Sequence, residues 1–166
     1  MNRTHGLLIL LGVLVLAAAG DLLWLYPALP EQVATKFNSD GVAKAWGTKA
    51  GFLAVQILAM LLLIGLALAG RFLVPRLPGN LINMPHRSYW LAPEREQFTR
   101  RRIGELVLAL CAAQLAFLIA LTHLTLRANL QPSPRLGNEP FWLVGGLLGI
   151  TALLIGRFYW TFRRPR

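Results

Sequence analysis

The sequence predicts an all-α membrane protein with four transmembrane helices, a short hairpin-like extracytoplasmic loop and a basic interfacial cytoplasmic helix. Hydrophobic residues make up 55% of the 166 residues and charged residues only 14%, against about 25% in a soluble domain. Four apolar segments each hold at least 20 residues, which is enough to cross a hydrocarbon core of about 30 Å. Lys and Arg are concentrated in alternate connecting segments, as in multi-pass proteins.

No internal repeat or low-complexity linker divides the chain, so residues 1–166 are interpreted as a single four-helix membrane domain. The spans are expected at about residues 7–26, 51–70, 103–126 and 141–160. A competing interpretation of the first segment is a signal peptide, with Arg3 before the apolar run and a cleavage site at 17–19. The apolar run continues to Tyr26, which favours a retained span.

Small and polar residues mark the ends and faces of these spans. Thr48 is placed to cap the N-terminus of the second helix. Gly145 and Gly149 form a G-x-x-x-G pair in the fourth, a spacing that lets another helix approach closely, including one from a second copy of the chain. The single cysteine, Cys111, lies in an apolar run and is expected to be a small buried hydrophobe.

The distribution of Lys and Arg predicts the orientation. The two chain ends and the segment 71–102 carry 12 of the 17 Lys and Arg residues, and the loops 27–50 and 127–140 carry the other 5. Positively charged segments stay in the cytoplasm, so both termini and segment 71–102 are expected there and the loop 27–50 outside. This bias also accounts for the formal charge of +10 without a nucleic-acid partner.

The loop 27–50 has the content of a hairpin. Residues 33–37 and 42–46 have strand-like composition, and the sequence Asn-Ser-Asp-Gly between them is typical of a turn. An isolated hairpin is only marginally stable, so this one is expected to rest on the membrane surface or on the loop 127–140.

Two interpretations of this loop stay open. In one it is a connector anchored by Phe37 and Trp46; in the other it is a recognition surface for an extracytoplasmic ligand. The candidate ligand-binding residues are Lys36, Asn38, Asp40, Gly41, Trp46 and Lys49.

The segment 71–102 mixes aromatic, apolar and basic residues, a composition suited to the membrane interface. Pro93 is expected in a first helical turn, and the helix is expected to continue into the third span with Glu96 and Arg100 paired at i, i+4. The segment is either a lipid-facing basic helix or a docking site for a partner protein.

Ionisable residues inside a membrane are candidates for function. Asp21 and His123 both lie near the outer ends of their spans, so they are expected to meet beneath the loop 27–50, with Lys49 as another partner for Asp21. Their role is either structural pairing or ligand and proton chemistry. Glu105 is expected at the opposite leaflet, near Arg101 and Arg102.

Two stretches resemble one known family. LPEQVATKFNSDGVAKAWGTKAGF is similar to the signature of the DUF1648 family, and NMPHRSYWLAPERE is similar to a second stretch common in it. Together they lie within about residues 27–100. Lys36 stands where the family usually has His, and Lys is a poor metal ligand at neutral pH, so a metal or proton-relay role does not carry over. The matching positions are Asn38, Gly41, Trp46, Gly47 and Lys49 in the first stretch and Asn83, Pro85, Tyr89, Trp90 and Pro93 in the second.

The resemblance implies a multi-pass protein of the bacterial plasma membrane. Its best-understood relatives are immunity and signal-transduction proteins for a secreted killing peptide, so a ligand-sensing or immunity module using the loop 27–50 is the first hypothesis. The alternatives are a scaffold subunit that docks a cytoplasmic protein through 71–102, and a small permease. The sequence has no catalytic or metal motif, and His5, His86 and His123 fall at different depths, so no enzyme, cofactor or metal is predicted.

Overall fold

The computed structural model describes residues 3–163, so the predicted C-terminal charges Arg164 and Arg166 lie outside the described residues. Four long helices dominate: α1 (Arg3–Leu25), α2 (Lys49–Phe72), α4 (Glu96–Asn129) and α5 (Glu139–Phe162). All four are long and apolar enough to cross a membrane. The predicted class, an all-α membrane protein with four spans, is confirmed, and each helix extends beyond the predicted span at both ends except at the C-terminus of α1.

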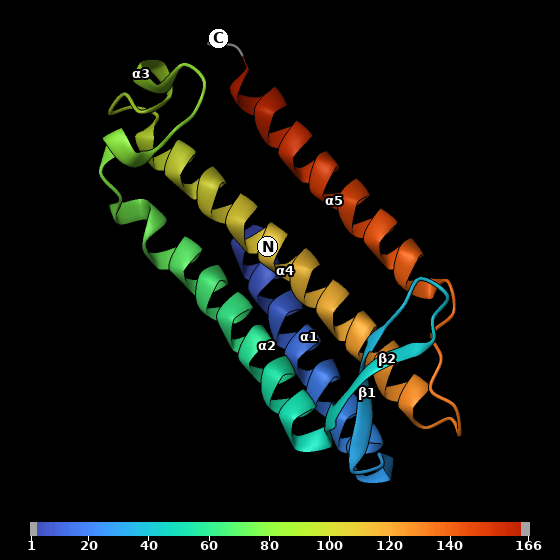
Figure 1. Ribbon diagram of the computed structural model, residues 1–166. Coiled ribbons are helices and arrows are strands. Elements are labelled where there is room, and N and C mark those ends of the chain that lie inside the picture. The colour runs from blue at the N-terminus through green and yellow to red at the C-terminus, as the bar shows by residue number, and fades with distance from the viewer. Residues whose placement is uncertain (1–2, 164–166) are drawn as a thin grey trace.

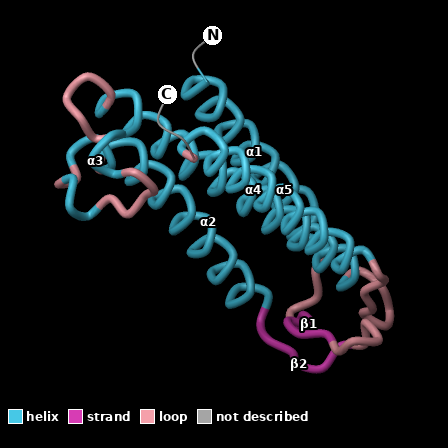
Figure 2. The backbone as a smooth tube through the Cα atoms, turned by 90° about the horizontal axis from the view of Figure 1, so that it is seen from above, coloured by secondary structure: helices cyan, strands magenta, loops and turns pink. Residues whose placement is uncertain are grey.

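Helix α4 lies at the centre of the bundle. Helices α1, α2 and α5 all pack against it (Figures 1 and 2). Helix α5 does so through a single stripe, because from Leu143 onward its partly or fully buried residues recur every three or four positions: Leu143, Leu147, Thr151, Leu154, Phe158 and Phe162. Its other faces are exposed and apolar, which suits contact with lipid.

Small residues allow the close crossing of α2 and α4. A Cβ atom added to Gly70 would clash with the Val107 side chain, and one added to Gly104 would lie 3.2 Å from the carbonyl oxygen of Gly70. At Gly145 and Gly149 an added Cβ would meet no atom within 4 Å. The predicted G-x-x-x-G pair therefore faces away from the bundle, and the close approach within the chain occurs elsewhere.

One end of the bundle, residues 26–48 and 130–138, is named here the hairpin end. After the short helix η1 (Tyr26–Ala28), the strands β1 (Gln32–Phe37) and β2 (Ala43–Thr48) pair antiparallel, which confirms the predicted hairpin (Figure 1). Gly41 has φ +74° in the turn, a conformation that favours glycine. The Thr48 hydroxyl accepts a hydrogen bond from the Gly51 N–H at 3.1 Å, so the predicted helix cap is present.

The opposite end, named here the arginine end, comprises residues 71–95, the first turns of α1 and α4 and the last turn of α5. Its connection forms the short helices η2 (Val74–Arg76), η3 (Gly79–Leu81) and α3 (Arg87–Trp90). The expected helix start at Pro93 is wrong, because residues 91–95 form turns in which the amides of Arg95 and Glu96 both donate to the Ala92 carbonyl. The basic helix begins at Glu96 and continues into the third span, as predicted.

Candidate functional site at the hairpin end

The hairpin is fixed to α4 by one buried asparagine that sequence analysis did not single out. The Oδ1 atom of Asn129 accepts a hydrogen bond from the Ala34 N–H at 2.6 Å, and its Nδ2 donates to the Ala34 carbonyl at 3.1 Å. Nδ2 also donates to the Thr125 carbonyl at 2.9 Å. Asn129 is only 4% exposed, so these bonds satisfy backbone groups that water does not reach. In the sequence it appears as an ordinary polar residue at a helix end.

Further contacts attach the hairpin to the loop 130–138, as the marginal stability of an isolated hairpin predicted. Val42 forms a β-bridge with Arg135, and the Leu136 N–H donates to the Gly41 carbonyl at 2.9 Å. A Cβ atom on Gly41 would clash with the Leu136 carbonyl. Gly41 is therefore required both by its own backbone conformation and by the close approach of this loop.

Asp21 and His123 lie directly beneath the hairpin and pair as predicted. The Asp21 Oδ1 and His123 Nδ1 atoms are 2.6 Å apart. The side chains are 22% and 40% exposed, respectively. This pair joins α1 to α4 near the hairpin end, one turn or so before each helix finishes.

The prediction that Lys49 is an alternative partner for Asp21 is wrong, because Lys49 pairs with another residue. Its Nζ atom lies 2.8 Å from a carboxylate oxygen of Glu31 and 5.6 Å from the centre of the Tyr26 ring. The Lys49 N–H also donates to the Glu31 carbonyl at 3.0 Å. Lys49 thus closes the base of the hairpin where it meets α2, and Glu31 is a further residue that sequence analysis missed.

Several candidate ligand residues have local structural roles. The Oδ1 atom of Asn38 accepts hydrogen bonds from the amides of Asp40 and Val42, at 3.0 and 2.8 Å, an Asx-type turn. The Asn38 amide nitrogen lies 3.5 Å from the Asp40 carboxylate. Asn38 and Gly41 therefore shape the turn, and Asp40 is the exposed carboxylate at its tip.

The outer surface of the hairpin is basic and aromatic. Exposed and half-buried residues alternate along β2, so Lys44 and Trp46 point outward. Lys36 is exposed on β1 opposite Ala45, and Arg135 is exposed beside Val42. The proposed anchoring by Trp46 is wrong, since this side chain is 54% exposed. Val33 and Ala34 of β1, which are 1% and 0% exposed, provide the anchor, and β1 contacts both α2 and α4.

The second motif stretch lies at the arginine end and is largely built into the fold. The Trp90 indole N–H donates to the Phe162 carbonyl at 3.2 Å, and the Trp90 and Phe162 rings pack edge to face. Tyr89 packs edge to face on Trp90 and lies under the guanidinium of Arg95. Pro93 lies in the turn before α4, and Asn83 and Pro85 lie in the preceding loop. Through Trp90, the second motif stretch therefore connects α3 to the end of α5.

Within residues 3–163, no group of three or more His, Cys, Asp or Glu side chains is arranged to hold a metal ion. His5 lies at the arginine end, and His86 is in the loop that precedes α3. His123 is paired with Asp21 beneath the hairpin. The three histidines are thus separate from one another.

The four spanning helices and the hairpin define an integral membrane protein with a small folded cap at one end. Residues 8–61, about a third of the chain, match the family model of DUF1648, a domain of unknown function, which supports the resemblance of this segment to that family. The match covers most of α1, the whole hairpin and the first half of α2, so it includes the first of the two stretches and not the second, in residues 83–96. No curated protein and no solved structure matches the chain.

Proposed function

We propose that the protein is a membrane-embedded sensor that binds an extracytoplasmic peptide at the hairpin and passes the binding event to the arginine end. The observation that carries this proposal is the path of α4. Asn129 at one end of this helix holds the hairpin, and Arg100 at the other donates to the carbonyls of Val74 and Leu77. One helix of 34 residues, about 51 Å long, joins the two ends.

The hairpin supports peptide recognition through its free edge. In the described sheet β2 pairs only with β1 along residues 43–48, so its outer edge offers backbone groups to an added strand. Trp46 supplies an exposed aromatic anchor of the kind enriched at binding hot spots. Lys36, Lys44 and Arg135 are also exposed on the hairpin and on the loop beside it, which favours a ligand with acidic side chains.

The arginine end is suited to transmit a change in α4. The Thr99 hydroxyl donates to the Trp90 carbonyl at 2.8 Å, and Trp90 contacts the end of α5. A displacement of α4 would therefore reach both the loop 71–95 and α5. The resemblance to immunity and signal-transduction proteins agrees with this role, and a partner protein at the arginine end would receive the signal.

The other two hypotheses have less support. A scaffold that docks a partner through Trp90 must compete with the internal bonds that this side chain makes to α5. A permease needs a path through the bundle. In the middle of the bundle the space among α1, α2 and α4 is filled by Leu11, Leu108 and Leu115. Under both hypotheses the hairpin surface is not needed for activity. The following experiment tests whether it is needed.

The test places an environment-sensitive fluorophore on a cysteine introduced at the exposed Ser88 of α3, with Cys111 changed to Ala and the full chain in lipid nanodiscs. The probes are extended synthetic peptides, one acidic, one neutral and one basic. The acidic peptide is expected to change the fluorescence saturably. Trp46→Ala should weaken this response about tenfold or more, and Trp142→Ala, which removes an exposed tryptophan of α5, should not. An equal response of both variants, or no response to any peptide, would overturn the proposal.

A further inference from the structure

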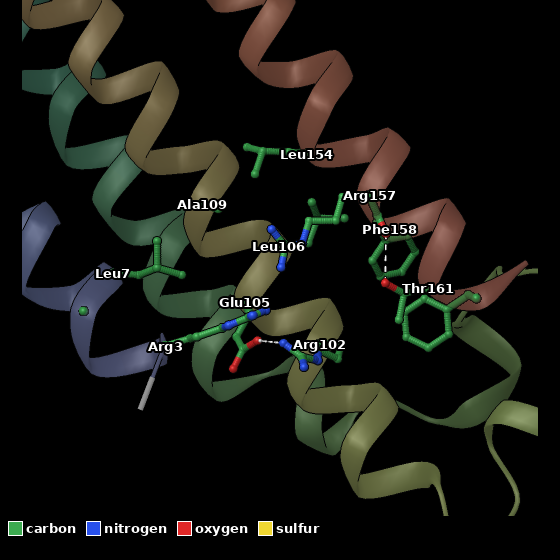
Figure 3. Close-up of a pocket in the computed structure, with 12 residues that line it drawn as sticks. Arg3, Leu7, Arg102, Glu105, Leu106, Ala109, Leu154, Arg157, Phe158 and Thr161 are labelled. Carbon is green, nitrogen blue, oxygen red and sulfur yellow. Dashed lines mark hydrogen bonds and ion pairs between the residues drawn. The ribbon is translucent and has the colours of Figure 1, made fainter. Parts of the chain in front are cut away.

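A cavity of about 540 Å³ lies at the arginine end between α1, α4 and α5. Figure 3 shows three arginines from three helices around it: Arg3 from α1, Arg102 from α4 and Arg157 from α5. The hairpin and its proposed ligand lie at the other end of the bundle, so this cavity is a separate feature.

The charges around the cavity do not balance. Glu105 is the only acidic residue that lines it among the described residues, and its carboxylate is already occupied. It lies 3.0 Å from Nη1 of Arg102 and 3.8 Å from Nε of Arg101, and it accepts a bond from the Thr4 hydroxyl at 3.4 Å. No described residue forms an ion pair or hydrogen bond with the guanidinium of Arg3 or Arg157.

One buried donor in the cavity wall also lacks a partner. The Nε atom of Arg102 is inaccessible to solvent, and no hydrogen-bond acceptor among residues 3–163 reaches it. A buried donor without an acceptor is costly. Because this atom cannot be reached from the cavity, the donors open to a ligand are the guanidinium groups of Arg3 and Arg157, which have no partner among the described residues and match the oxygens of a phosphate.

The polarity of the cavity changes with depth. On each of the three helices the arginine lies nearer this end of the bundle than the aliphatic residues that line the cavity: Arg3 precedes Leu7, Arg102 precedes Leu106 and Ala109, and Arg157 follows Leu154. Phe158 and Phe162 also line the cavity, nearer the end of α5. Ala109 lies seven residues beyond Arg102 on α4, about 10 Å deeper. A phospholipid has the same sequence of groups, an anionic headgroup followed by an acyl chain.

We infer that this cavity binds one anionic phospholipid, with its phosphate among Arg3, Arg102 and Arg157 and an acyl chain along Leu7, Leu106 and Leu154. The lipid fills the space between α1 and α5, which both pack on α4. Basic pockets between spanning helices recognise anionic headgroups in this way. A free phosphate would meet the same arginines but would leave the apolar part of the cavity empty.

The test uses the full chain in mild detergent and native mass spectrometry with phosphatidylglycerol, phosphatidylcholine and inorganic phosphate. Phosphatidylglycerol is expected to be retained at one copy per chain in preference to phosphatidylcholine. The double variant Arg3→Gln/Arg157→Gln should bind it about tenfold more weakly. The matched control is Arg87→Gln/Arg163→Gln, which removes two exposed arginines at the same end of the molecule that do not line the cavity.

A second variant tests the acyl-chain part of the site. Ala109→Phe fills the deep end without changing charge, and it should reduce lipid retention while the melting temperature of the lipid-free chain stays within a few degrees. Equal losses in the two arginine double variants would show attraction to surface charge only. Displacement of the lipid by inorganic phosphate at equal concentration, or full retention in Ala109→Phe, would also overturn the inference.

Discussion

The Asn129 side chain bonds to both backbone polar groups of Ala34, as a neighbouring strand would. It therefore occupies the inner edge of β1 and leaves the outer edge of β2 as the open one. The bonds between Asn129 and Ala34 hold β1 against α4, so Val33 and Ala34 are buried and Trp46 is exposed.

We expect Asn129→Ala to release the hairpin from α4. The change leaves the amide and carbonyl of Ala34 without partners in a buried position, which costs about 1–3 kcal/mol. Hydrogen exchange in residues 32–48 should accelerate, whereas exchange in the centre of α4 should not. Asn138→Ala is the control, because Asn138 is exposed and makes no side-chain bond at the start of α5. Unchanged exchange in the hairpin would show that the bridge from Val42 to Arg135 is sufficient to hold it.

We expect Asp21→Asn to lower the melting temperature of the chain in detergent, because the substitution removes the charge that faces His123. The side chains are partly exposed, so the cost should be about 1–2 kcal/mol rather than the value of about 3–5 kcal/mol for a fully buried pair. Adding His123→Ala should cost little more, since the interaction is already lost. Strictly additive losses in the double-mutant cycle would contradict an energetic coupling of the two residues.

We expect Gly70→Ala to separate α2 from α4, because the added methyl group would clash with Val107. Overpacking of this kind costs about 1–3 kcal/mol. Gly65→Ala on the same helix is the matched control, since its added methyl group would meet no atom within 4 Å. Combining Gly70→Ala with Val107→Ala should restore part of the lost thermal stability. A Gly70→Ala protein as stable as the Gly65→Ala protein would refute the close crossing.

The orientation is tested with alkaline phosphatase fusions, which are active only outside the cytoplasm. Fusions at residues 40 and 133 should be active, and fusions at 85 and 166 inactive, because Lys and Arg are concentrated in the segments that hold the second pair of sites. Activity at 85 or 166 would contradict the topology. A mature N-terminus near Gly20 would instead support cleavage of the first segment.

Sequence analysis predicted the features that depend on composition and local chemistry. The four spans follow from continuous apolar runs, the hairpin from two strand-like segments around Asn38 and Gly41, and the Thr48 cap from its position before α2. The meeting of Asp21 and His123 followed from counting residues along two spans. These predictions needed no knowledge of how helices pack.

The remaining features depend on tertiary contacts that no local pattern contains. Asn129 and Glu31 resemble ordinary boundary residues until the hairpin folds back onto them. The glycines that matter for packing are Gly70 and Gly104, which lie on different helices, so a motif within one helix does not identify them. Trp46 was misplaced because the strand composition does not tell which strand of the hairpin rests on the bundle.

The two polar contacts between α1 and α4 lie in register. Thr4 meets Glu105, and Asp21 meets His123, 17 residues further along α1 and 18 further along α4, a distance of about 26 Å. A shift of one helix along the other by a single turn would break both contacts. Sliding of α1 along α4 in a thinner or thicker bilayer would therefore cost both contacts, and we expect the two helices to respond to hydrophobic mismatch by tilting together. In that case bilayer thickness would change the angle at which α4 carries the hairpin.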